Sequence, residues 1–176
     1  MNRAELDKLI QEFLDRVHTF GYGRYSYSSV DVERVLWSLK RVLQEHRKEL
    51  NNHNYKFLQK DDTPIMYTIL IQLLTKIDPV GFSLFINQLQ EIPSNMFSCM
   101  QFQKRTITFP EVKTVHENAF AGSNVEKLVF PKLASCSPDA FIYCSDLETI
   151  SVPSAIYSEI IADISRFDDG IKVCEV

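Results

Sequence analysis

Two passages of this chain repeat each other, and this repeat constrains the fold more than any other feature of the sequence. Residues 111–120 and 132–141 both end in an Ala-Phe pair, and the two pairs lie 21 positions apart. A β-prone segment that ends in proline recurs with them: Thr-Ile-Thr-Phe-Pro, Lys-Leu-Val-Phe-Pro and Thr-Ile-Ser-Val-Pro begin at residues 106, 127 and 149. A period of about 21 to 23 residues indicates a solenoid, in which each unit buries its apolar face against its neighbours.

Apolar and polar residues alternate within each of these three segments. Alternation with a period of two predicts strands with one face in the core and the other toward solvent. Phe97, Phe120 and Phe141 recur at one place in the successive units, so we expect them to stack in a column. The side chains expected to point inward are Ile107, Phe109, Leu128, Phe130, Ile150 and Val152, and those expected to point outward are Thr106, Thr108, Lys127, Val129, Thr149 and Ser151.

The pattern resembles the BspA-type leucine-rich repeat, whose unit runs strand, proline, short apolar turn, Ala-Phe, a small residue or cysteine, and a leucine-like position before the next strand. Two units match this order clearly, and a degraded unit precedes them, with Ile92-Pro93 and Met96-Phe97-Ser98-Cys99 in the proline and Ala-Phe places. The resemblance covers residues 92–153. It implies a right-handed, β-rich solenoid that commonly mediates protein contact, and it carries no catalytic residues.

The first half of the chain predicts helices instead of strands. Its apolar residues recur at spacings of three and four, which is the pattern of one helix face. Gly21 ends the first helix, and the Thr63-Pro64 and Asp78-Pro79 pairs each place a capping oxygen before a proline at the first helical position. The four helices are expected at residues 3–20, 30–50, 65–77 and 79–89.

These patterns together predict an α+β fold, with an N-terminal helical domain followed by a short capped leucine-rich-repeat β-solenoid. Residues 1–90 would form the helical domain, and its last two helices would cap the first repeat. Residues 91–176 would form the repeat domain. A helix at 155–167, with Ile156, Ile160, Ile161 and Ile164 on one side, and a strand at 171–176 would close its far end, since a short array needs both ends covered.

The charge of the chain is divided unequally between its two halves. Residues 1–90 hold 12 Lys and Arg against 11 Asp and Glu, whereas the remaining residues hold 7 against 12. Direct nucleic-acid binding normally needs a basic footprint, so neither half favours it.

The lack of recognisable targeting signals and the positions of the cysteines both predict a cytoplasmic location. The charged amino terminus runs straight into an amphipathic pattern, without the apolar core of a secretory signal, and no 18-residue apolar run predicts a membrane span. The four cysteines are expected to be reduced core thiols, as is usual inside cells. They are Cys99, Cys136, Cys144 and Cys174.

No pattern in the chain indicates catalysis, a metal or a cofactor. The five glycines are too scattered for a phosphate-binding loop, and the sequence has no Cys-x-x-Cys pair. His46 and His53 lie seven positions apart, but two imidazoles without a third ligand make a weak zinc site. We therefore expect a protein that is not an enzyme and binds no metal or cofactor.

Two regions are candidates for binding another protein. The loop at residues 21–28 combines tyrosine, glycine, serine and arginine, which gives an adaptable backbone with amphipathic anchors. Its tyrosines could equally pack over a helix junction. The acidic turns of the repeats form the other region. The candidate protein-binding residues are Tyr22, Arg24, Tyr25, Tyr27, Glu126, Lys127, Asp146 and Glu148.

The leading hypothesis for function is a non-catalytic protein-interaction protein. Its narrower form is a phage-encoded or mobile-element-encoded inhibitor of a host defence protein. The first alternative is an acidic mimic of nucleic acid that blocks a nucleic-acid-binding enzyme, and the second is an adhesin-like surface repeat protein. A homodimer formed through the edge of the solenoid is open as well.

Overall fold

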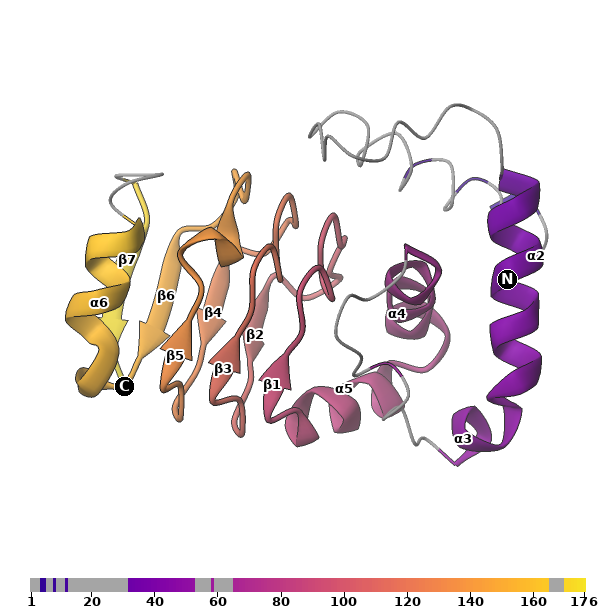
Figure 1. Ribbon diagram of the computed structural model, residues 1–176, viewed down its shortest axis with the longest axis horizontal. Coiled ribbons are helices and arrows are strands. Elements are labelled where there is room, and N and C mark those ends of the chain that lie inside the picture. Colours follow the sequence, from indigo (N-terminus) through magenta and orange to yellow (C-terminus); the bar gives the residue numbers. More distant parts are fainter. Residues whose placement is uncertain are drawn as a thin grey trace.

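Helices make up the first half of the described chain, and strands dominate the second half (Figure 1). The computed structural model describes residues 4–5, 8, 12, 32–52, 58, 65–164 and 170–176. Residues 4, 5, 8 and 12 are helical, in agreement with the first predicted helix, while the rest of that helix lies outside the described residues.

The helix predicted at residues 30–50 is divided in two at His46. Helix α2 (Val32–Glu45) precedes this residue and helix α3 (Arg47–Asn51) follows it. His46 has φ −107° and ψ 22°, which is outside the helical region. The hydrogen-bond ladder nevertheless continues, because the N–H of Leu50 donates to the carbonyl of His46 at 2.9 Å. The N–H of His46 donates to the carbonyl of Val42 at 3.0 Å, so His46 takes part in helical hydrogen bonds on both sides of the break.

Helices α4 (Ile65–Ile77) and α5 (Pro79–Gln88) lie where the sequence places them. The carboxylate of Asp78 caps α5 by accepting a hydrogen bond from the N–H of Gly81 at 3.0 Å, and Pro79 occupies the first turn. Helix α4 is buried on nearly all sides, with the run from Ile69 to Leu74 almost inaccessible to solvent. In Figure 1, α5 lies beside the first strands of the repeats and α4 lies next to it.

Four parallel strands form the first sheet, in the order β2 (Thr106–Thr108), β4 (Lys127–Val129), β6 (Thr149–Val152) and β7 (Lys172–Glu175). The first three coincide with the predicted strands, and their six inward side chains are buried. Thr106, Lys127, Thr149 and Lys172 face one another across the sheet, which fixes the repeat in register.

A second parallel sheet consists of β1 (Glu91–Ile92), β3 (Thr114–Val115) and β5 (Ser135–Cys136). The sequence analysis treated the segments of β3 and β5 as apolar turns and placed Ile92-Pro93 at the position of the repeat proline. Both interpretations are wrong, because Ile92 pairs with Val115 and so belongs to the second sheet. Each strand is two residues long, which is too short to show an alternating pattern. Figure 1 shows the strands of both sheets succeeding one another along the molecule, with α2 to α5 at one end and α6 (Ser154–Ile164) and β7 at the other.

Phenylalanine rings fill the space between the two sheets. The rings of Phe97, Phe120 and Phe141 stack with centroids 5.3 and 5.7 Å apart, which confirms the predicted column. Phe109 and Phe130 form a second column, stacked at 5.3 Å. The two columns meet edge to face, since Phe109 and Phe120 lie 5.6 Å apart at an angle of 72°. Such packing adds directional attraction to the burial of apolar surface.

One turn of each repeat requires a left-handed backbone. Cys99, Gly122 and Tyr143 have φ values of 55°, 65° and 59°. Hydrogen bonds from the N–H of Cys99 to the carbonyl of Ala121 and from Gly122 to Ile142 show that the three positions are equivalent. Only glycine adopts this conformation without steric cost, so the turns after Phe97 and Phe141 are strained relative to the middle one.

The C-terminal end contains two departures from the expected burial. Ile156, Ile160 and Ile164 of α6 are buried, but Ile161 is 36% exposed, because it lies about 100° around the helix from Ile160. Ser151 was expected to point to solvent and is instead only 5% exposed. It lies between Val129 and Cys174 on neighbouring strands, and these flank its small side chain.

Candidate protein-binding surface

The outward face of the first sheet carries a row of polar side chains. Lys127, one of the predicted binding residues, is exposed at the centre of this row, between Thr106 and Thr149. Lys172 of β7 extends the row to the C-terminal end and is exposed as well. The sequence analysis did not include Lys172, although its place in a predicted strand was a usable signal. We call Thr106, Lys127, Thr149 and Lys172 the outward row.

Glu126 and Asp146 lie on either side of Arg105. The guanidinium of Arg105 forms ion pairs with both carboxylates, and its Nε donates to the carbonyl of Asn124 at 2.9 Å. Arg105 therefore ties together three successive turns of the chain. The fold brings the two acidic residues close together, but a cation lies between them, so this part of the surface gives no support to a mimic of nucleic acid. Glu148 is exposed.

The tyrosine loop cannot be placed on this surface. Tyr22, Arg24, Tyr25 and Tyr27 all lie outside the described residues. Their role in binding stays a prediction.

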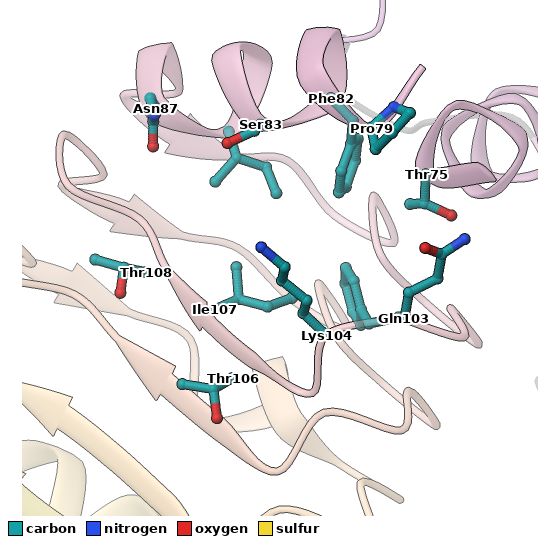
Figure 2. Close-up of a pocket in the computed structure, with 12 residues that line it drawn as sticks. Thr75, Pro79, Phe82, Ser83, Asn87, Gln103, Lys104, Thr106, Ile107 and Thr108 are labelled. Carbon is teal, nitrogen blue, oxygen red and sulfur yellow. The ribbon is translucent and has the colours of Figure 1, made fainter. Parts of the chain in front are cut away.

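A groove separates helix α5 from strand β2 (Figure 2). It encloses about 300 Å³, at the lower end of the volumes typical of ligand sites. In Figure 2, Ser83 and Asn87 of α5 lie on one side, Thr106, Ile107 and Thr108 on the other, and the side chain of Lys104 extends toward the helix. The residues that line the groove are Thr75, Pro79, Phe82, Ser83, Ile86, Asn87, Phe102, Gln103, Lys104, Thr106, Ile107 and Thr108.

The repeats of this chain match a known family. The model described as "BspA type Leucine rich repeat region (6 copies)" covers residues 80–163. Residues 80–163 are a BspA-type leucine-rich repeat region. The match begins within α5 and ends within α6, so it is wider at both ends than the predicted range of 92–153. No curated protein and no solved structure matches the chain.

The BspA-type leucine-rich repeat region limits the classes of function to consider. Repeats of this kind typically serve in protein binding or as surface repeats and are typically non-catalytic. Within the described ranges, no helix is long and apolar enough to cross a membrane.

Helix α2 carries an exposed aromatic residue that the sequence analysis missed. The side chain of Trp37 is 63% exposed, and the guanidinium of Arg41 lies 5.5 Å from the centre of its ring. Tryptophan and arginine are the residues most enriched among energetic hot spots of interfaces. The usable signal was that Trp37 lies off the apolar face defined by Leu39 and Val42, which are buried.

The thiols of the repeat region are poor candidates for chemistry. Burial raises the pKa of Cys136 to about 12, with smaller contributions from the carboxylates of Asp163 and Glu159. Burial also raises the pKa of Cys144 to about 11, against the opposing effect of a hydrogen bond with Ser123. Cys99 is buried with these two, and Cys174 is half-buried. Among the described residues, no three His, Cys, Asp or Glu side chains are grouped as metal ligands would be.

Proposed function

We propose that this chain is a non-catalytic protein-interaction protein, in which a short capped solenoid presents a rigid binding face. The proposed arrangement divides the chain into a helical domain at 1–90 and a repeat domain at 91–176, with α4 and α5 as the cap of the first repeat. The outward row is the observation that carries this proposal. Four neighbouring strands hold its side chains in register, spaced by about 4.8 Å from one strand to the next.

The packing beneath the outward row favours binding over a purely structural role. Ile107, Leu128 and Ile150 on the opposite face of the same strands are buried in the phenylalanine core, so the row is held rigidly. A rigid surface loses little conformational entropy when a partner docks. Lys127 and Lys172 make the row basic, which suits an acidic patch on the partner.

Affinity capture with charge-reversal variants tests this function. The variant Lys127→Glu/Lys172→Glu reverses the charge of the outward row. The control variant Lys76→Glu/Lys113→Glu reverses the charge of two exposed lysines outside it. We expect a partner that the native chain and the second variant both retain, and that the first variant loses. With the purified partner, the first variant should bind at least about tenfold more weakly. A partner retained equally by both variants would exclude the outward row as its site.

The narrower proposal is that the bound partner is a host defence protein and that binding inhibits it. Support for it is the combination of a rigid polar face with an array of few repeats, which suits a small blocking protein. The test is the activity of the purified partner measured with and without one equivalent of this chain. A complex that forms while the partner's activity stays unchanged would contradict inhibition and leave the interaction itself intact.

A further inference from the structure

Strand β2 has main-chain groups that face away from its sheet. It is the outermost strand on the side of α5. The N–H of Lys127 donates to the carbonyl of Arg105 at 3.0 Å, and the N–H of Phe109 donates to the carbonyl of Val129 at 2.9 Å. In a parallel ladder alternate residues face the same neighbour, so positions 105, 107 and 109 face β4. The N–H and C=O groups of Thr106 and Thr108 consequently face the groove beside α5.

Among the described residues, no preceding strand pairs with these groups. Strands β2, β4 and β6 begin at residues 106, 127 and 149, so a strand one repeat before β2 would fall near Leu84. Leu84 belongs to α5, whose backbone is satisfied by its own helical hydrogen bonds. Among the described residues, no hydrogen bond joins α5 to the main chain of Thr106 or Thr108. The groove is thus the place of one further strand.

The walls of this groove suit one apolar and one acidic side chain. Phe82 and Ile86 of α5 line it together with Phe102 and Ile107, and all four retain 5 to 8% exposure. Lys104 is exposed, and in Figure 2 its ammonium group extends across the space between β2 and the helix. A strand that alternates apolar and acidic residues would place one side chain on each feature.

The segment leading into β2 is held in place before any ligand arrives. The side-chain oxygen of Asn124 accepts a hydrogen bond from the N–H of Phe102 at 2.7 Å, and the side-chain amide donates to the carbonyl of Phe102 at 3.2 Å. Arg105 is fixed at the other end of the segment by Glu126 and Asp146. Such preorganisation lowers the entropic cost of adding a strand.

We propose that this groove binds an extended peptide of a partner protein, which adds to β2 as a further parallel strand. Its main chain bonds to the N–H and C=O groups of Thr106 and Thr108, which is the usual basis of recognition by strand addition. An apolar side chain of the peptide packs against Phe82, Ile86 and Ile107, and a carboxylate next to it pairs with Lys104. The groove shares only Thr106 with the outward row, and Lys127 and Lys172 do not line it, so their charge reversal tests the outward row without altering the groove.

A peptide copied from the chain's own repeats serves as the probe. Residues 147–153, Leu-Glu-Thr-Ile-Ser-Val-Pro, form a natural parallel strand with an acidic residue near its start. Fluorescence anisotropy should show saturable binding of the fluorescein-labelled peptide. Hydrogen exchange should slow at least about tenfold at the amides of Thr106 and Thr108 when the peptide is added. Absence of binding, or slowed exchange at Val173 and Glu175 of β7 instead, would overturn the proposal.

Matched variants separate strand addition from other modes of binding. Thr108→Pro removes one N–H that faces the groove and should weaken binding at least about tenfold. Glu175→Pro removes an N–H from the far edge of the sheet and should change nothing. Lys104→Glu should weaken binding, whereas Lys127→Glu on the outward row should not. Thermal unfolding of each variant shows that it is folded.

Two further results would count against the partner peptide. A probe with N-methylated Ile150 and Val152 places methyl groups where main-chain donors should lie, and undiminished affinity would exclude strand addition. Light scattering of the native chain alone tests whether a second copy of the chain fills the groove. If its mass rises with concentration and Thr108→Pro abolishes the rise, a second copy of the chain fills the groove, and the assignment to a separate partner is wrong.

Discussion

Truncation of Phe120 to alanine tests the stacked-repeat architecture most directly. The ring of Phe120 is fully buried and contacts four others, with centroid distances of 5.3 Å to Phe97, 5.7 Å to Phe141, 5.6 Å to Phe109 and 6.2 Å to Phe130. It joins the two columns of the core. Phe→Ala substitutions in cores cost about 3–5 kcal/mol, and a site with neighbours on every side collapses poorly, so we expect a loss of about 4–5 kcal/mol.

Urea unfolding followed by circular dichroism measures this loss. For a chain of this length, 1 kcal/mol shifts the melting temperature by about 2–4 °C, so Phe120→Ala should lower it by roughly 8–20 °C. Phe141→Ala is the internal comparison, because Phe141 is 7% exposed and contacts only Phe120 and Phe130 among the described rings. It should cost nearer to about 3 kcal/mol.

The outcome that refutes the reasoning is specific. If Phe120→Ala costs less than about 1 kcal/mol, or no more than Phe141→Ala, the central ring does not join the repeats as the geometry indicates. Tyr143→Ala serves as the control for loss of an aromatic ring at the surface, since Tyr143 is 58% exposed. Its effect should be a small fraction of that of Phe120→Ala.

Three further predictions concern the left-handed turns and the thiols. Tyr143→Gly places glycine where φ is 59° and should raise the free energy of unfolding by about 0.5–1 kcal/mol. Gly122→Ala, at φ 65°, should lower the free energy of unfolding by about 1–3 kcal/mol. Equal effects of the two changes in urea unfolding would contradict the shared left-handed turn. The pKa of Cys136 and of Cys144 is raised by burial to about 12 and about 11, above the ordinary value of 9.0, so the unfolded chain loses these protons first. The two thiols should leave the free energy of unfolding unchanged below about pH 9 and lower it as the pH rises toward 11. The decrease should be smaller in the Cys136→Ala/Cys144→Ala variant. At pH 8 a thiol reagent should label the half-buried Cys174 rapidly and the other three cysteines only on unfolding, and rapid labelling of Cys136 would show that its repeat is open.

Local sequence signals explain which features of the fold could be predicted. The strands β2, β4 and β6 and the phenylalanine column follow from residues that recur at one period. The Asp78-Pro79 pair locates the start of α5 because a cap and a proline act within one helical turn. The resemblance of residues 92–153 to BspA-type repeats could be recognised for the same reason, and the family match over residues 80–163 confirms it.

Contacts between distant residues explain what could not be predicted. The sheet of β1, β3 and β5 consists of two-residue strands, which are stabilised by pairing across the repeats and leave no pattern of their own. Arg105 and Asp146 lie 41 residues apart in the chain, so their ion pair appears only when the units stack. Burial of Ser151 likewise depends on neighbours from β4 and β7.

The sequence by itself determined the repeating unit, since each unit encodes its own strand, turn and core phenylalanine. Only the tertiary structure decided where the array stops and what its end exposes. Whether the main chain of β2 has a hydrogen-bonding partner on the side of α5 depends on packing between segments that are far apart in the chain. The result, within the part of the chain that the structure describes, is an unpaired strand edge at Thr106 and Thr108, beside a groove that no single repeat contains.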